Sequence, residues 1–115
     1  MEKLEKFMAI FEGLDCAYGT YRVSGEPNAK GKSVGQALVV RKPPTKDLWQ
    51  RHFDGVDPSL GIIPIRADNT CIWGCIDIDQ YPLDLAALVA KIKKLKLPLV
   101  CCRSKSGGAH VFAFT

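Results

Sequence analysis

Residues 73–79 read WGCIDID, an apolar run that carries two carboxylates two positions apart. Successive side chains of a β-strand point to opposite faces, so Asp77 and Asp79 would share one face of a strand, opposite the intervening isoleucines. Two like charges held side by side repel each other, and a bound divalent cation relieves that repulsion. The run therefore predicts a strand with one polar face that is a candidate metal site.

Residues 103–112 (RSKSGGAHVF) are the second segment that carries chemistry, a small-residue turn with two serines, a lysine and a histidine. Its two adjacent glycines allow backbone N–H groups to approach phosphate oxygens, and Lys105 adds a positive charge. His110 can donate a hydrogen bond to the same phosphates, whether neutral or protonated. The segment predicts a phosphate-binding loop next to the carboxylate strand.

Length and composition limit the class of protein. The chain has 115 residues, of which 47% are apolar, and its formal net charge is +4. This is enough for one hydrophobic core but too little for two full domains. We expect a cytoplasmic protein with no membrane partner, because no apolar stretch approaches the roughly 20 residues of a membrane span and the N-terminus lacks a signal-peptide core. The mild positive charge suits nucleic acid or nucleotide without specifying either.

The cysteines are odd in number, and most lie in apolar, strand-like runs, which favours reduced thiols in the core over a disulfide framework. A zinc site is disfavoured by the C-x3-C spacing of Cys71 and Cys75. The adjacent Cys101 and Cys102 would also point to opposite faces of a strand. The five positions are Cys16, Cys71, Cys75, Cys101 and Cys102.

Three helices are expected from the apolar periodicity. They span residues 2–13, 45–53 and 84–96, with Thr45 and Asp84 as N-caps of the second and third. The third helix carries a lysine cluster that we interpret as a solvated face, with nucleic-acid contact as the alternative. These lysines are Lys91, Lys93, Lys94 and Lys96.

Strands are expected between these helices, where β-branched and aromatic residues are bounded by turn residues. The strands at 16–23 and 34–41 would form a long hairpin around a basic loop. Those at 60–65 and 71–79 would form a second hairpin through the turn at 66–70. Two further strands are expected over residues 98–103 and 109–115.

Together these segments resemble the catalytic core of archaeo-eukaryotic primases, the primase-polymerases, in particular the primase modules of mobile elements, phages and TOTE-type conflict systems. A lone D-x-D is a weak signal, whereas D-x-D joined by one helix and one strand to S-K-S-G-G-x-H is fairly specific. The resemblance covers roughly residues 45–115 and, more loosely, the first 44. Its motifs are Trp49-x-x-His52-x-x-Gly55 and residues 60–65 (LGIIPI), 68–73 (DNTCIW), 76–79 (IDID) and 97–110 (LPLVCCRSKSGGAH).

The resemblance implies an α/β (α+β) fold with a mainly antiparallel, partly RRM-like sheet and flanking helices. In that family the D-x-D carboxylates bind the catalytic divalent metal, and the second motif holds the triphosphate of the incoming nucleotide. Carried over to this chain, Asp77 and Asp79 would bind Mg²⁺ or Mn²⁺, and His110 would contact the triphosphate. The other residues on the phosphate path would be Ser104, Lys105, Ser106, Gly107 and Gly108.

The chain departs from the family pattern in two places. The second motif commonly reads S-x-H, but the residue two positions before His110 is Gly108, so we expect the serine role to pass to Ser106 or to the backbone. A third acidic residue, expected on a later strand, has no counterpart. We therefore expect residues 1–115 to be the N-terminal part of a truncated primase-polymerase catalytic domain, with a helix and hairpin over 1–44 and the motif-bearing portion over 45–115.

The function expected from these motifs is that of a DNA primase/polymerase-type nucleotidyltransferase. It would transfer nucleotides from nucleoside triphosphates to a 3′-hydroxyl on a single-stranded DNA template, with a helicase or nuclease of the same system as a further partner. The alternatives are a non-catalytic nucleic-acid or nucleotide-binding module and a metal-dependent phosphodiesterase or nuclease. His52 is expected to be structural rather than catalytic, and Trp49 and Trp73 to be core residues rather than base-stacking platforms.

Overall fold

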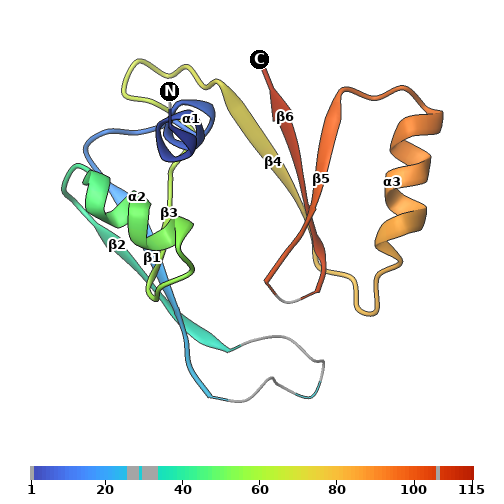
Figure 1. The fold of residues 1–115 in the computed structure, drawn as a ribbon, viewed down its shortest axis with the longest axis horizontal. Coiled ribbons are helices and arrows are strands. Elements are labelled where there is room, and N and C mark those ends of the chain that lie inside the picture. The colour runs from blue at the N-terminus through green and yellow to red at the C-terminus, as the bar shows by residue number, and fades with distance from the viewer. Residues whose placement is uncertain (1, 26–28, 30–33, 106) are drawn as a thin grey trace. The chain divides into compact units, whose positions relative to one another are not determined.

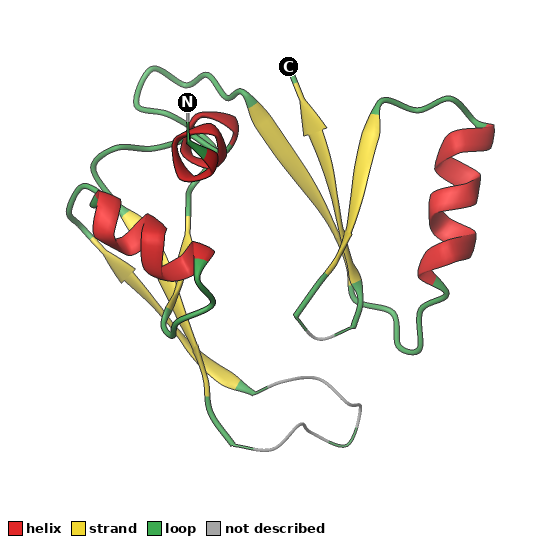
Figure 2. Cartoon of the chain, viewed as in Figure 1, coloured by secondary structure: helices red, strands yellow, loops and turns green. Residues whose placement is uncertain are grey.

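The computed structural model describes residues 2–25, 29, 34–105 and 107–115 (Figure 1). Two compact units emerge from its contacts, one formed by residues up to Gly25 together with Val34–Ile72, and one that contains Trp73–Thr115. Each unit has a three-stranded antiparallel sheet with helical cover (Figure 2). The predicted α+β class with antiparallel pairing is confirmed. The elements are α1 (Lys3–Ile10), β1 (Tyr18–Val23), β2 (Gly35–Val40), α2 (Lys46–Phe53), β3 (Ser59–Gly61), β4 (Trp73–Ile78), α3 (Leu85–Lys94), β5 (Leu99–Arg103) and β6 (Ala109–Phe114).

The first unit contains the sheet β2-β1-β3. Strands β1 and β2 pair in antiparallel register from Tyr18 opposite Val40 to Val23 opposite Gly35, which confirms the predicted long hairpin. Most of the basic loop expected between these strands, residues 26–28 and 30–33, lies outside the described residues. The core of this unit joins one face of the sheet to α1 and α2 through buried Leu4, Tyr18, Trp49 and Leu60. The expectation that Trp49 is a core residue is confirmed, since it is 6% exposed.

The predicted second hairpin is wrong. Strand β3 pairs with β1, and β4 pairs with β6, so the segments before and after the 66–70 turn lie in different sheets. Two local features end β3 at Gly61. The N–H of Leu14 bonds to the carbonyl oxygen of Ile63 at 2.8 Å, and Pro64 has no N–H to donate to a strand ladder.

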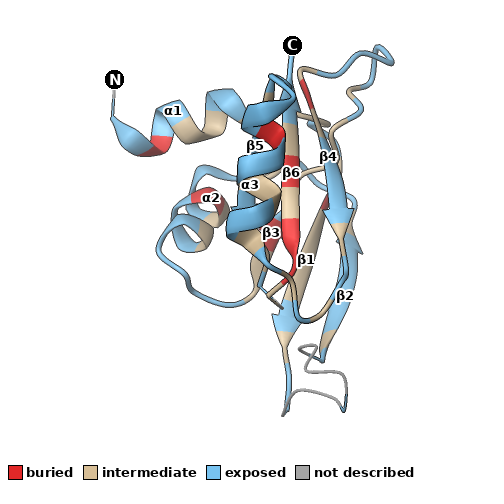
Figure 3. Cartoon of the chain, turned by 90° about the vertical axis from the view of Figure 1, so that its right-hand side faces the viewer, coloured by how far each residue is buried: buried red, intermediate tan, exposed pale blue. Residues whose placement is uncertain are grey.

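The second unit contains the sheet β4-β6-β5, with α3 packed against one of its faces. Strand β6 is central, and its Ala109 and Val111 are 0% and 3% exposed. These two residues and Ile92 of α3 form the buried core of the unit, and the corresponding bands of β6 can be seen alongside α3 in Figure 3. The face of the sheet that carries His110 is therefore the face opposite α3.

Local capping follows the sequence closely. Thr45 Oγ1 accepts a hydrogen bond from the N–H of Leu48 at 3.3 Å, and Asp84 Oδ1 accepts one from the N–H of Ala87 at 3.0 Å. Both predicted N-caps are confirmed. Two helices are shorter than predicted: α1 ends at Ile10 and α3 ends at Lys94. Among the described residues, no helix is long and apolar enough to cross a membrane.

The cysteines are free thiols, as expected, but the prediction that they belong to the core is wrong for four of the five. Only Cys101 is partly buried, because it lies on the face of β5 that packs against α3. Cys75 and Cys102 alternate onto the opposite face, opposite Phe112 and His110 of β6. Cys16 and Cys71 lie outside the strands, where no sheet covers them.

Candidate metal and nucleotide site

Asp77 and His110 are brought together by strand pairing. They occupy directly opposed positions of β4 and β6, and His110 Nε2 lies 3.6 Å from Asp77 Oδ1. The His110 side chain is 44% exposed and the Asp77 side chain is 59% exposed, so both remain in contact with solvent. The contact is an ion pair when the imidazole is protonated. A residue of each sequence motif therefore lies on the same sheet face, opposite α3.

Asp79 lies just beyond the end of β4, which stops at Ile78. Its Oδ1 accepts a hydrogen bond from the Tyr81 hydroxyl at 2.9 Å, and the carboxylate is exposed. The contribution of Tyr81 was not predicted from the sequence. A phenol at i+2 holds the second carboxylate of the D-x-D motif in one orientation, which reduces the entropy that Asp79 would lose on binding a cation.

The motif loop is a tight turn between β5 and β6. The N–H of Ser104 bonds to the Gly108 carbonyl oxygen at 3.0 Å, and the N–H of Gly107 bonds to the Ser104 carbonyl oxygen at 3.1 Å. Gly107 has a φ of +89°, a conformation that glycine adopts without penalty. The Gly107 N–H is already used in a hydrogen bond within the turn, so it could contact a phosphate only if the turn opened. Lys105 is exposed, and the predicted Ser106 lies outside the described residues.

Gly108 is the position at which the sequence departs from S-x-H, and the structure gives a physical reason. A Cβ added there would lie 2.2 Å from the Ile78 carbonyl oxygen, at the end of β4. It would also lie 3.3 Å from Ser104 Oγ. That hydroxyl is buried and has no hydrogen-bond partner within the described part of the chain. Ser104, rather than residue 108, therefore places a serine hydroxyl beside the end of the D-x-D strand.

The donor set suits a hard divalent cation. Mg²⁺ usually keeps several water ligands and binds through one or two carboxylates together with substrate phosphates, and the two exposed carboxylates of this site offer such oxygen ligands. Across residues 2–25, 29, 34–105 and 107–115, no group of three or more His, Cys, Asp or Glu side chains is arranged to hold a metal ion.

The carboxylates of this site all come from β4 and the residues just after it. Partial desolvation by neighbouring atoms raises the pKa of the Cys75 thiol, although the residue as a whole is exposed, and the negative charge of Asp77 two residues away raises it further, so this thiol stays protonated and weakly nucleophilic. Beyond Asp84 the sequence contains no Asp or Glu. The β5 and β6 side of the site therefore offers only neutral or cationic groups to an anionic ligand. The cation of the motif loop is Lys105, whereas Arg103 lies opposite Ala109, on the sheet face that packs against α3.

His52 belongs to the first unit and has a structural contact. Its Nδ1 accepts a hydrogen bond from the N–H of Leu60 at 2.9 Å, and its ring stacks on Phe7 with centroids 6.2 Å apart. The acceptor role requires an unprotonated Nδ1. The imidazole thus ties α2 to β3, in line with the structural interpretation of this histidine.

Replacing His52 by alanine is expected to destabilise the protein by about 1–3 kcal/mol, because the N–H of Leu60 loses its acceptor in a partly buried position. Chemical denaturation measures the effect. Nucleotide affinity, measured under native conditions, should be unchanged. A variant with wild-type stability would contradict the structural role, and a selective loss of nucleotide binding would indicate a functional one.

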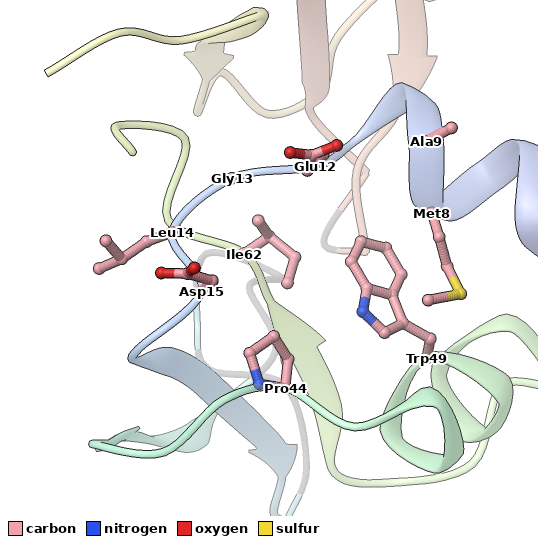
Figure 4. A pocket seen from close by; sticks show the side chains of 9 residues that line it. All are labelled: Met8, Ala9, Glu12, Gly13, Leu14, Asp15, Pro44, Trp49 and Ile62. Atoms are coloured by element: carbon pink, nitrogen blue, oxygen red, sulfur yellow. The ribbon is translucent and has the colours of Figure 1, made fainter. Parts of the chain in front are cut away.

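The first unit also contains a pocket, shown in Figure 4. The Trp49 indole and the side chains of Met8, Ile62 and Pro44 make its wall apolar. The carboxylate of Glu12 at this pocket lies 3.8 Å from Arg66. None of the residues that the motifs predict for metal or phosphate binding lines this pocket.

Comparison with known families agrees with the motifs. Residues 2–115 match the family model described as TOTE conflict system, Archaeo-Eukaryotic Primase domain. The chain therefore belongs to the archaeo-eukaryotic primase domain family of TOTE conflict systems, whose members are generally catalytic nucleotidyltransferases that typically use divalent metals. Searches of curated proteins and of solved structures gave no match.

Proposed function

We propose that this chain carries the metal-binding and nucleotide-binding part of a DNA primase-polymerase, which transfers nucleotides from nucleoside triphosphates to a 3′-hydroxyl on a single-stranded DNA template. The observation that supports it best is the pairing of Asp77 with His110 across β4 and β6, at 3.6 Å. Phosphoryl transfer needs positioning and charge neutralisation more than covalent help from the protein. A carboxylate and an imidazole side by side offer one group for a cation and one for a phosphate.

Asp77 and Asp79 would hold Mg²⁺ or Mn²⁺, which when bound would neutralise phosphate charge and increase the acidity of the attacking hydroxyl. His110 would orient the triphosphate by donating a hydrogen bond from Nε2. An imidazole N–H is a donor in both the neutral and the protonated ring.

Ser104 would take part in phosphate binding through its hydroxyl. A buried hydroxyl without a partner costs about 1–3 kcal/mol, and a ligand oxygen that reached this hydroxyl would remove that cost by accepting a hydrogen bond from it. Lys105, exposed in the same turn, would add a positive charge along the phosphate path. Ser106, Gly107 and Gly108 complete the proposed phosphate path, with the Gly107 N–H available only after its bond to Ser104 breaks.

Calorimetric titration of a nucleoside triphosphate into this chain tests the proposal. We expect binding with Mn²⁺ present and none in excess chelator. Salt-sensitive DNA binding that survives loss of both Asp77 and Asp79, without metal-dependent nucleotide binding, would instead identify a non-catalytic module. Cleavage of DNA with Mn²⁺ and no nucleotide would identify a nuclease. Either outcome would overturn the proposed function.

His110→Ala is expected to weaken metal-dependent nucleotide binding about tenfold or more, since a hydrogen bond to a charged group contributes about 1.5–3 kcal/mol. His110→Gln, which keeps an N–H donor, should recover part of the affinity. The same calorimetric titration measures both variants. Equal affinities for the wild type and the alanine variant would exclude a phosphate contact by His110.

A further inference from the structure

A row of aromatic rings lies on the same sheet face as Asp77 and His110. Side chains alternate along β6, so Phe112 and Phe114 share the face of His110, while Ala109 and Val111 point to the core under α3. Phe114 is 41% exposed and Phe112 is partly buried. Trp73, opposite Phe114 on β4, is 9% exposed, which confirms the expectation that it is a core residue.

The ring centroids are evenly spaced along β6. The centroids of His110 and Phe112 are 6.1 Å apart with an interplanar angle of 78°, and those of Phe112 and Phe114 are 6.2 Å apart with an angle of 27°. The Trp73 ring lies 6.0 Å from Phe112. The two phenylalanine rings are thus close to parallel. Phe112 lies between Phe114 on one side and His110, the histidine that we propose to bind phosphate, on the other.

We infer that Phe112 and Phe114 form a base-stacking platform for a single strand of DNA, which approaches the Asp77–His110 pair along β6. The inferred direction of the DNA, toward Asp77 and His110, rests on the proposed function. Aromatic side chains stack on the π-face of any base, so such a row binds single strands without sequence preference. It assigns a nucleic-acid contact to residues that the D-x-D and histidine motifs do not include.

Charge and solvation favour a nucleic-acid strand over a protein on this face. The residues of β5 and β6 on this face are Val100, Cys102, His110, Phe112 and Phe114, so a polyphosphate backbone meets no acidic group from these two strands and can accept a hydrogen bond from His110. A protein that covered the rings closely would also have to desolvate the exposed Asp77 carboxylate beside them, at a cost that only a well-matched partner offsets. A single strand can stack its bases while its phosphates stay in water.

The spacing of the rings favours a single strand over a duplex. Bases in a B-form strand are about 3.4 Å apart along the axis, and the observed ring spacings of 6.1 and 6.2 Å are about twice that distance. Successive rings can therefore contact successive bases only if the strand is stretched. A single strand can extend in this way, whereas the bases of a duplex are already stacked on one another.

The test uses Trp73 as an internal reporter. The chain has two tryptophans, and Trp49→Phe, a conservative change in the core of the other unit, leaves Trp73 as the only one. An oligothymidylate is titrated into this background in chelator, without nucleotide. We expect quenching of Trp73 emission, and we expect Phe112→Leu to weaken binding about tenfold. Phe112→Tyr should restore it, and Phe53→Leu, at an exposed phenylalanine of the first unit, should have no effect.

An abasic oligonucleotide of equal length separates stacking from charge, because it carries the same phosphates without bases. Equal affinity for both oligonucleotides, or unchanged affinity in Phe112→Leu, would overturn the platform. Self-association of the chain that Phe112→Leu abolishes, without DNA binding, would assign the rings to a second copy instead and would also overturn it. Because metal and nucleotide are absent, failure here is distinct from failure of Mn²⁺-dependent nucleotide binding.

Discussion

Replacing Asp77 by asparagine is expected to reduce metal-dependent nucleotide transfer by about 10³-fold. A catalytic divalent ion stabilises the transition state by several kcal/mol, and each 1.36 kcal/mol corresponds to a factor of ten in rate. Asparagine keeps the shape of the side chain but removes its charge, so the ion loses a ligand and His110 loses its ionic partner. Primer extension measures the rate, and calorimetry with Mn²⁺ measures nucleotide affinity.

The fold of the Asp77→Asn variant should be preserved, because the side chain is 59% exposed and surface substitutions usually change stability by no more than about 0.5 kcal/mol. Asp47→Asn is the matched control, since Asp47 is an exposed carboxylate in the first turn of α2, in the other unit. Asp79→Asn should resemble Asp77→Asn. Tyr81→Phe, which removes the hydrogen bond to Asp79, should have a smaller effect. Full extension activity in both aspartate variants would contradict the metal-binding role.

The sequence predicted best those features that depend on neighbouring residues. Thr45 and Asp84 cap helices because each side chain reaches an N–H three residues away, whatever the rest of the fold does. The strand that contains Asp77 was predictable for the same reason, since its alternation is visible in six residues. The motif resemblance added the link to the His110 loop, and the β4–β6 pairing places these two side chains together.

Pairing between distant strands could not be predicted from local patterns. Residues 60–65 and 71–79 resemble two arms of a hairpin, yet β3 pairs with β1, about 40 positions earlier in the chain, and β4 pairs with β6. The exposure of Cys75 and Cys102 has the same origin, because it depends on which sheet face α3 covers. The aromatic residues of β6 could be assigned to the exposed face of the sheet only once the structure showed which face α3 covers.

Gly108→Ser, which restores the common S-x-H pattern, is expected to impair the protein rather than improve it. The new Cβ would lie 2.2 Å from the Ile78 carbonyl oxygen, a backbone atom that cannot move without disturbing β4. Forcing extra atoms into a packed site costs about 1–3 kcal/mol, and the contact with backbone places this variant at the upper end. Thermal unfolding should show a melting temperature lower by about 10 °C, and the displaced end of β4 should weaken Mn²⁺-dependent nucleotide binding.

Gly74→Ala is the matched control for this prediction. Gly74 lies in β4 of the same unit, and an added Cβ there would meet no atom within 4 Å. Its substitution should leave stability unchanged or raise it by about 0.4–1 kcal/mol, because alanine restricts the unfolded chain. If Gly108→Ser instead bound nucleotide more tightly at wild-type stability, residue 108 would be the phosphate-binding serine position. The serine role would then belong to residue 108, and the unpartnered hydroxyl of Ser104 would no longer be needed to explain phosphate binding.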